Sequence, residues 1–274
     1  LYTLRDVNHC LRLFHTVDYD SEFSPHASVK VRFRDAGHIL GSAILEVWLT
    51  DLQGRTRKLV ASGDLGQPGR PILRDPTPID SADVLLIEST YGDRLHKDMP
   101  STLDELVEVV QRTVAKGNVV IPAFAVGRTQ ELIYEFLKLS SQGRLGPLDI
   151  FIDSPMAIAA TEVTRKHFTL FDDEASELFA QAKQLTQQLR IHFVSDVQDS
   201  IKLTRVRSGA VIISASGMCD AGRVIHHLHQ NLGRRECAVV IAGFQAQGTL
   251  GRRLVDGERH VRLLGDDIEV QASI

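Results

Sequence analysis

The stretch NVVIPAFAVGRTQE, from Asn118 to Glu131, joins a short apolar strand to a helix through a glycine turn. Its uninterrupted apolar run is typical of a parallel strand that is covered on both faces. The turn at Gly127 opens a helix that we expect to continue to Leu139. A strand, a tight turn and a helix in this order predict an α/β domain.

The same alternation surrounds this stretch. A helix is expected from a serine cap at Ser101 to about Gly117. Apolar runs and helical periodicity then predict strands at 149–152, 210–214 and 237–242, and helices at 157–167, 175–189, 223–231 and 249–256. A final hairpin, 261–274, turns at Gly265-Asp266. The pattern predicts a mostly parallel sheet flanked by helices.

The N-terminal part has a different character. After an amphipathic helix at 2–14, the pattern predicts strands at 29–33, 43–49 and 57–62. The apolar run from Val84 to Ile87 is typical of a strand covered on both faces. A polar, proline-containing segment from Leu95 to Pro100 is the best domain boundary, so we expect domains at 1–95 and 96–274.

The composition of the 274 residues is that of an ordinary globular protein, with 43% hydrophobic and 24% charged residues. The net charge of −4 provides no overall basic field, so nucleic-acid binding would need a local patch. The widely spaced Cys10, Cys219 and Cys237 fit buried thiols in a reducing, cytoplasmic compartment. No stretch approaches the roughly 18 apolar residues of a membrane span, so no membrane partner is expected.

Two glycine turns could present metal ligands. His38 lies in DAGHILGS, from Asp35 to Ser42, and Asp64 lies in SGDLG, from Ser62 to Gly66. An imidazole and a carboxylate at strand ends are donors that suit zinc. For either residue taken singly, a surface histidine or a turn-forming aspartate is the more common explanation. Glu88 ends the apolar run, where it could orient a general acid or simply cap a helix or form an ion pair.

Two strand–turn–helix junctions could hold phosphate groups. Arg128 follows Gly127 at the start of a helix, and Ser214, Ser216 and Gly217 form a small-residue turn after a strand. Helix N-terminal amides, hydroxyls and an arginine favour anions, although each turn alone could be a tight connection only. In the cluster from His226 to His229, packing or a single phosphate contact at His226 is favoured over zinc, because residues two apart on a helix point apart.

Together, these features include six stretches in a fixed order: DAGHILGS from Asp35, SGDLG from Ser62, ESTYGD from Glu88, PAFAVGRTQE from Pro122, SASGMCDAGRVIHH from Ser214 and GFQAQGTLGRRL from Gly243. Their order resembles that of the β-CASP metallo-β-lactamases, a family of RNA- and DNA-processing nucleases. The resemblance covers essentially the whole chain. It implies a partial metallo-β-lactamase αββα domain to about Leu95 and an inserted β-CASP domain beyond it.

The resemblance also implies roles for single residues. His38 matches a zinc ligand, and Asp64 matches the carboxylate that bridges two zinc ions. Glu88 matches an acid that supports a general-acid histidine. Arg128 and the turn from Ser214 to Gly217 resemble parts of an RNA-backbone groove. The implied reaction is in-line attack on an RNA phosphodiester by a zinc-activated water.

Two family motifs have no counterpart here. The HxHxDH segment lies before Leu1 in such proteins, and a histidine of the FSAHAD type follows Ile274. Both ends therefore resemble cuts through a larger protein, which we expect to cleave RNA although this chain alone does not. The alternatives are a non-catalytic RNA-binding scaffold of the same fold and a small-molecule metallohydrolase. The sequence also leaves a homodimer open.

Overall fold

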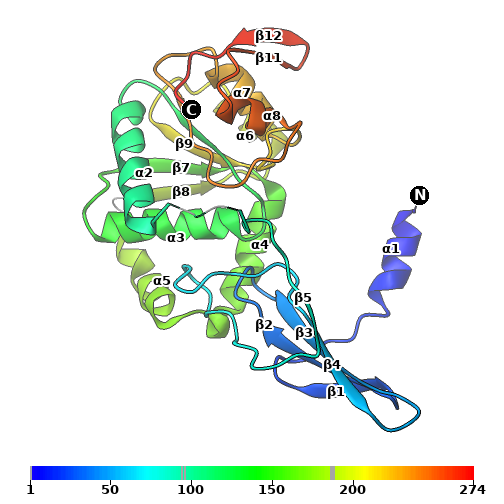
Figure 1. The fold of residues 1–274 in the computed structure, drawn as a ribbon. Coiled ribbons are helices and arrows are strands. Elements are labelled where there is room, and N and C mark those ends of the chain that lie inside the picture. The colour runs from blue at the N-terminus through cyan, green and yellow to red at the C-terminus, as the bar shows by residue number, and fades with distance from the viewer. Residues whose placement is uncertain (1, 94, 96, 186–188) are drawn as a thin grey trace. The chain divides into compact units, whose positions relative to one another are not determined.

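The structure is a computed structural model that describes residues 2–93, 95, 97–185 and 189–274 (Figure 1). The chain divides into two compact units, one of Leu1–Arg70 with Arg74–Asp93, the other of Pro71–Leu73 with Arg94–Ile274. We call them unit 1 and unit 2 and describe each by itself.

Unit 1 is built on one mixed five-stranded sheet. Its elements are α1 (Leu4–Leu11), β1 (Glu22–His26), β2 (Val29–Asp35), β3 (Ala43–Thr50), β4 (Thr56–Ala61) and β5 (Val84–Leu86). The strands follow one another in the order β1-β2-β3-β4-β5; the first four are antiparallel, and β5 runs parallel to β4. A small core of Ala36, Ile44 and Val60 lies under one face.

The burial expected for the apolar run at Val84 is wrong. The side chains of Val84, Leu85 and Leu86 are 48%, 56% and 58% exposed. Successive side chains of a strand point to opposite faces of the sheet, so neither face of β5 is covered by the described residues. β5 is also an edge strand, which pairs with β4 on one side and with no other described strand on the other. An apolar edge of this kind is normally covered by another part of a protein.

Unit 2 contains the predicted parallel sheet. Its elements are α2 (Met99–Val114), β6 (Val119–Pro122), α3 (Arg128–Ser141), β7 (Leu148–Ile152), α4 (Pro155–Lys166), η1 (Phe168–Leu170), α5 (Asp173–Leu185), β8 (Leu189–Phe193), α6 (Val197–Leu203), β9 (Ala210–Ser214), α7 (Val224–Asn231), β10 (Ala238–Val239), α8 (Leu250–Val255), β11 (His260–Leu263) and β12 (Asp266–Glu269). The sheet order is β10-β6-β9-β7-β8, with every pair parallel.

Alternate residues of these strands enter different cores on the two faces of the sheet. Ile121 and Ile213 pack into a large cluster with residues of α2, α3 and α5. Val120 packs with α7 and α8, and Ile212 packs with Leu203 at the end of α6. Period-two alternation on a sheet with helices on both faces explains this division. The expected α/β class, with a parallel sheet flanked by helices, is confirmed.

Some local expectations differ from the structure. The cap of α2 is Asp98, whose carboxylate accepts the N–H of Ser101 at 2.9 Å, so Ser101 lies inside the helix. Cys219 and Cys237 are buried as expected, but Cys10 is exposed on the unpacked helix α1. None of the helices in the described ranges has the length and apolar character needed to cross a bilayer.

Candidate functional site

Two glycines let the turns of His38 and Asp64 pack backbone against backbone in unit 1. A Cβ atom at Gly66 would lie 1.7 Å from the carbonyl oxygen of Gly37, and the Gly66 N–H donates to the Ala36 carbonyl at 2.8 Å. Gly37 itself has φ of +60°, in the left-handed region that glycine favours. The spacing of glycines in the sequence therefore brings the two turns together.

These turns place the His38 and Asp64 side chains next to each other. The Nε2 atom of His38 lies 4.0 Å from an Oδ of Asp64, and the two side chains are 38% and 81% exposed. Nitrogen and oxygen ligands on one tetrahedral zinc ion lie about 3.4 Å apart, given zinc bonds of roughly 2.0–2.2 Å. A small side-chain rotation would bring the pair to that separation, so both donors fit one ion.

Glu88 is tied to the same pair of turns. Its backbone N–H donates to the Ser62 hydroxyl at 3.0 Å, and its carboxylate accepts N–H groups of Leu65 at 3.4 Å and Thr90 at 2.8 Å. The N–H donated by Thr90 is the main cause that lowers the pKa of the Glu88 carboxyl. An ionised carboxylate is thus fixed beside the His38 and Asp64 turns.

The described residues contain no group of three or more His, Cys, Asp or Glu side chains arranged to hold a metal ion. His38 and Asp64 are therefore a pair of donors, whereas a zinc site takes at least three protein ligands. The pair has the right chemistry for zinc but is incomplete within the described part of the chain.

Three turns, which follow β6, β9 and β10 in that order, meet at the carboxyl edge of the parallel sheet in unit 2. The Ala123 N–H donates to the Ser214 carbonyl at 3.0 Å, which joins the first turn to the second. The third turn contributes Gln245, whose amide donates to the Gly217 carbonyl at 3.0 Å. Open α/β sheets bind ligands at this edge. Motifs that are far apart in the sequence thus form one surface.

The predicted phosphate contacts are not equally available. Arg128 is 30% exposed and its guanidinium donates to the Glu131 carboxylate at 2.6 Å. Ser216 is partly exposed, and Gly217 is buried against Phe124. The Ser214 side chain is 1% exposed and donates to the Asp153 carbonyl at 2.8 Å. Ser214 therefore holds the turn and does not present its hydroxyl to solvent.

His226 lies on α7, which follows the Ser214–Gly217 turn in the sequence. It is exposed and lines a pocket of about 560 Å³ with Arg223 and His229, between α6 and α7. His229 pairs with Asp266 at 2.8 Å, whereas His227 is fully buried. His227 and His229 therefore have separate partners, as the helical spacing indicated.

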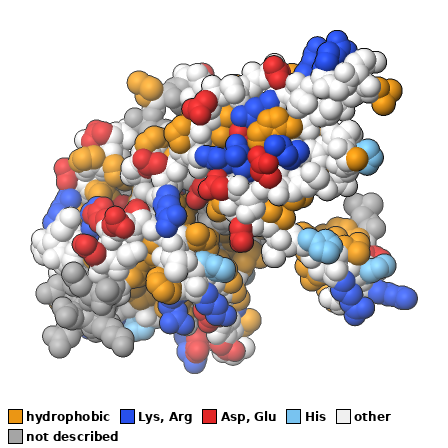
Figure 2. Space-filling model, turned by 90° about the horizontal axis from the view of Figure 1, so that it is seen from below, with side chains coloured by type: hydrophobic (Ala, Val, Ile, Leu, Met, Phe, Trp, Pro, Cys, Tyr) orange, Lys and Arg blue, Asp and Glu red, His pale blue; other side chains and the backbone are white. Residues whose placement is uncertain are grey.

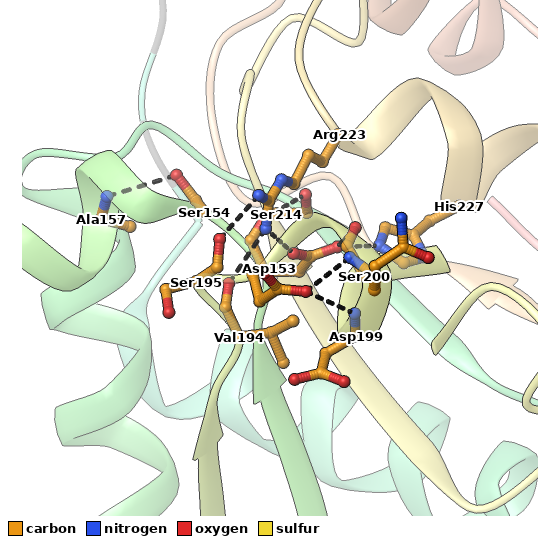
Figure 3. Close-up of polar contacts among 12 residues, drawn as sticks. Asp153, Ser154, Ala157, Val194, Ser195, Asp199, Ser200, Ser214, Arg223 and His227 are labelled. Atoms are coloured by element: carbon orange, nitrogen blue, oxygen red, sulfur yellow. Dashed lines mark hydrogen bonds and ion pairs between the residues drawn. The ribbon is translucent and has the colours of Figure 1, made fainter. Parts of the chain in front are cut away.

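A buried carboxylate that the sequence did not reveal lies at the same edge (Figure 3). Asp153 is 0% exposed and accepts hydrogen bonds from His227 Nε2 at 2.6 Å, the Ser200 hydroxyl at 2.6 Å and Arg223 Nη1 at 2.7 Å. Burial raises the pKa of Asp153, but the bonds from His227, Ser200 and Arg223 outweigh it, so the pKa lies below its usual value. Arg223 also donates to the carbonyls of Val194 and Ser195.

Asp153 thus ties together the connections that follow three parallel strands, β7, β8 and β9. Its place directly after β7 was the one signal available, because a carboxylate that ends a parallel strand lies at the ligand-binding edge. The same reasoning selected Glu88. The hydrogen-bond partners of Asp153, however, come from distant parts of the sequence.

The surface itself carries mixed charge. Figure 2 shows acidic and basic side chains interspersed over most of the visible face, in line with the net charge of −4. An anionic ligand would therefore be recognised by local groups such as those at the sheet edge, and not by a broad basic field.

Comparisons with known proteins agree with the motifs. Residues 129–254 match the model of the Beta-Casp domain. The chain is 34% identical over 271 residues to Ribonuclease TTHA0252 of Thermus thermophilus, an alignment that covers 98% of the chain and 61% of that protein. It is 29% identical over 278 residues to an RNase J-like protein of Methanocaldococcus jannaschii, covering 100% and 62%.

A third relative is named for a different role. The chain is 27% identical over 273 residues to the transcription termination factor FttA of Pyrococcus abyssi, covering 97% of the chain and 41% of that factor. The chain thus spans less than two thirds of the length of each of these relatives.

Proposed function

The chain belongs to the β-CASP family of metallo-β-lactamase-fold proteins, and from this premise we propose that the whole protein is a zinc-dependent ribonuclease. The observation that carries the proposal is the approach of His38 Nε2 to Asp64 at 4.0 Å, on turns held together by Gly37 and Gly66. We further propose that residues 1–95 are part of a metallo-β-lactamase domain and that residues 96–274 are the β-CASP domain.

In this proposal, His38 and Asp64 are ligands of a site for two zinc ions, and Glu88 is the carboxylate that orients a proton donor. Zinc held there would activate water and stabilise charge that develops on a phosphodiester. The fixed hydrogen bonds of Glu88 to Leu65 and Thr90 keep its carboxylate ionised and oriented beside the ligands. The described residues supply two metal donors, so we propose that the remaining ligands lie outside the described residues.

The number of zinc ions that the isolated chain binds tests whether the remaining ligands lie outside the described residues. The isolated 274-residue chain is expected to bind fewer than two zinc ions tightly, because a two-ion site needs more ligands than His38 and Asp64. Metal analysis after dialysis against a weak chelator measures the number of ions bound per chain. Two tightly held ions per chain would refute the proposed incompleteness of the site.

RNA is the proposed substrate and partner, bound at the sheet edge of unit 2 by Arg128, Ser216 and Gly217, with His226 as an outlying contact. Ser214 supports the turn from inside. Three free cysteines fit a reducing compartment, so we expect the protein to act in the cytoplasm. The proposal includes a homodimer, which a measurement of the oligomeric state in solution would test.

Arg128→Ala is expected to weaken RNA binding roughly tenfold, because a charge-assisted contact to phosphate is lost. The slope of log affinity against log salt should also fall by about one, as one fewer counterion is released. Both are measured by binding titrations from low to high salt. The matched control is Arg165→Ala, an exposed arginine on α4. An unchanged salt slope for Arg128→Ala would exclude a phosphate contact.

A second candidate function is a non-catalytic RNA-binding protein of the same fold. The observation in its favour is that the described residues supply two metal donors and no larger group. The two functions differ in one result, since the scaffold binds RNA without cleaving it. Incubation of the intact protein with zinc and a labelled single-stranded RNA separates them.

A further inference from the structure

An aromatic ring is exposed at the edge of the parallel sheet, in the turn between β6 and α3. Phe124 is 47% exposed, whereas its neighbours Ala123 and Ala125 are 1% and 8% exposed. Single exposed hydrophobic residues are common on protein surfaces. The position of this one matters, because it lies beside the Ser216–Gly217 turn and four residues before Arg128.

The Phe124 ring is held in place by its surroundings. A Cβ atom built at Gly217 would lie 3.0 Å from Cδ2 of the ring and 3.0 Å from the Phe124 nitrogen. The absence of a side chain at Gly217 thus lets the ring approach the backbone of the second turn. The Phe124 carbonyl accepts the Thr129 hydroxyl at 2.8 Å and the Thr129 N–H at 3.2 Å, which fixes the backbone that carries the ring.

A fixed, half-exposed ring next to groups that we propose bind phosphate is a combination with which proteins bind single-stranded RNA. Bases that are free of a duplex stack on aromatic side chains, while basic groups and backbone amides hold the phosphates. Arg128 and Ser216 would supply the polar contacts here, and Phe124 an apolar surface close to them. A ring that is already fixed loses little conformational entropy when a base binds.

We propose that Phe124 is a base-stacking residue for single-stranded RNA, on which one unpaired nucleobase lies while the adjoining backbone contacts Arg128 and the Ser216–Gly217 turn. This inference rests on the proposed RNA function. The stacking surface has no hydrogen-bonding groups of its own, so it contributes affinity for any base and little sequence preference.

The test uses the full-length protein with a chelator present, so that binding is measured without cleavage. Phe124→Ala is expected to raise the dissociation constant of a short single-stranded RNA about tenfold, within the range for loss of one stacked base. Phe124→Tyr should restore most of the affinity, because tyrosine offers a similar ring. The slope of log affinity against log salt should not change, because no charge is removed. Phe168→Ala, at a ring 61% exposed in η1, is the matched control.

A second ligand separates stacking from a purely structural role. An abasic ribose-phosphate oligomer of the same length keeps the phosphates but offers no base. Phe124→Ala should leave its affinity unchanged. An equal loss for RNA and for the abasic oligomer would overturn the proposal, because the ring would then shape the turn or pack against another part of the protein.

The remaining outcomes distinguish this inference from the function on which it rests. Normal RNA affinity in Phe124→Ala refutes stacking but leaves the RNA function intact. Failure of the unaltered full-length protein to bind single-stranded RNA refutes both.

Discussion

Asp64→Ala in the intact protein is expected to lower the RNA cleavage rate on the order of a thousandfold, equivalent to about 4 kcal/mol of transition-state stabilisation. The carboxylate lies 4.0 Å from His38 Nε2, and its proposed role is to hold zinc. RNA affinity should stay close to that of the unaltered protein, because the proposed RNA contacts are in unit 2. Single-turnover cleavage and separate binding titrations measure the two effects.

A matched control for this prediction is Asp80→Ala, which removes an exposed carboxylate from the same unit. That variant should cleave RNA normally. Normal RNA cleavage by Asp64→Ala would contradict the proposed role of Asp64 as a metal ligand. Loss of RNA binding together with cleavage would indicate that the substitution disrupts folding instead.

Asp153→Ala is expected to destabilise the protein by roughly 3–5 kcal/mol, because removal of one partner leaves buried polar groups without compensation. Asp153 and His227 are fully buried, and the Arg223 side chain is 19% exposed. Ser200 would also lose its acceptor. The free energy of unfolding, measured with denaturant, is the readout. Asp267→Ala, at an exposed position in β12, is the control and should change it little.

Acid should diminish the difference in the free energy of unfolding between Asp153→Ala and the unaltered protein. Because the folded-state pKa of Asp153 is lowered, its contribution is fully present above the ordinary aspartate pKa of about 3.9. The contribution is lost as the pH falls below that value through the lowered pKa. A stability difference that did not shrink below about pH 4 would contradict the role assigned to this carboxylate.

The sequence predicted the parallel sheet well because its central strands are unbroken apolar runs. Val119 to Ile121 and Ala210 to Ile213 are fully or almost fully buried. Two strands and one α-helix were missed, each for a local reason. β1 includes a proline, β8 carries Arg190 and His192 among its apolar residues, and α6 has seven residues, too few for a clear helical period.

The candidate site in unit 1 could be predicted because its residues lie in short glycine-containing turns at strand ends. The Asp153 network could not, since its three side-chain partners lie 47, 70 and 74 residues away in the sequence. Contacts of that range follow from the parallel strand order, which the local pattern does not specify. The inward direction of Ser214 has the same origin, because β9 is an inner strand next to β7.

Zinc affinity across a double-substitution cycle tests most directly whether His38 and Asp64 share one ion. Competitive titration of the full-length protein should show a clear loss of affinity for His38→Ala and for Asp64→Ala, with little further loss when both are replaced, since one missing ligand already disrupts the common site. Unchanged affinity in either single variant, or losses that simply add, would mean that the imidazole and the carboxylate do not bind the same metal.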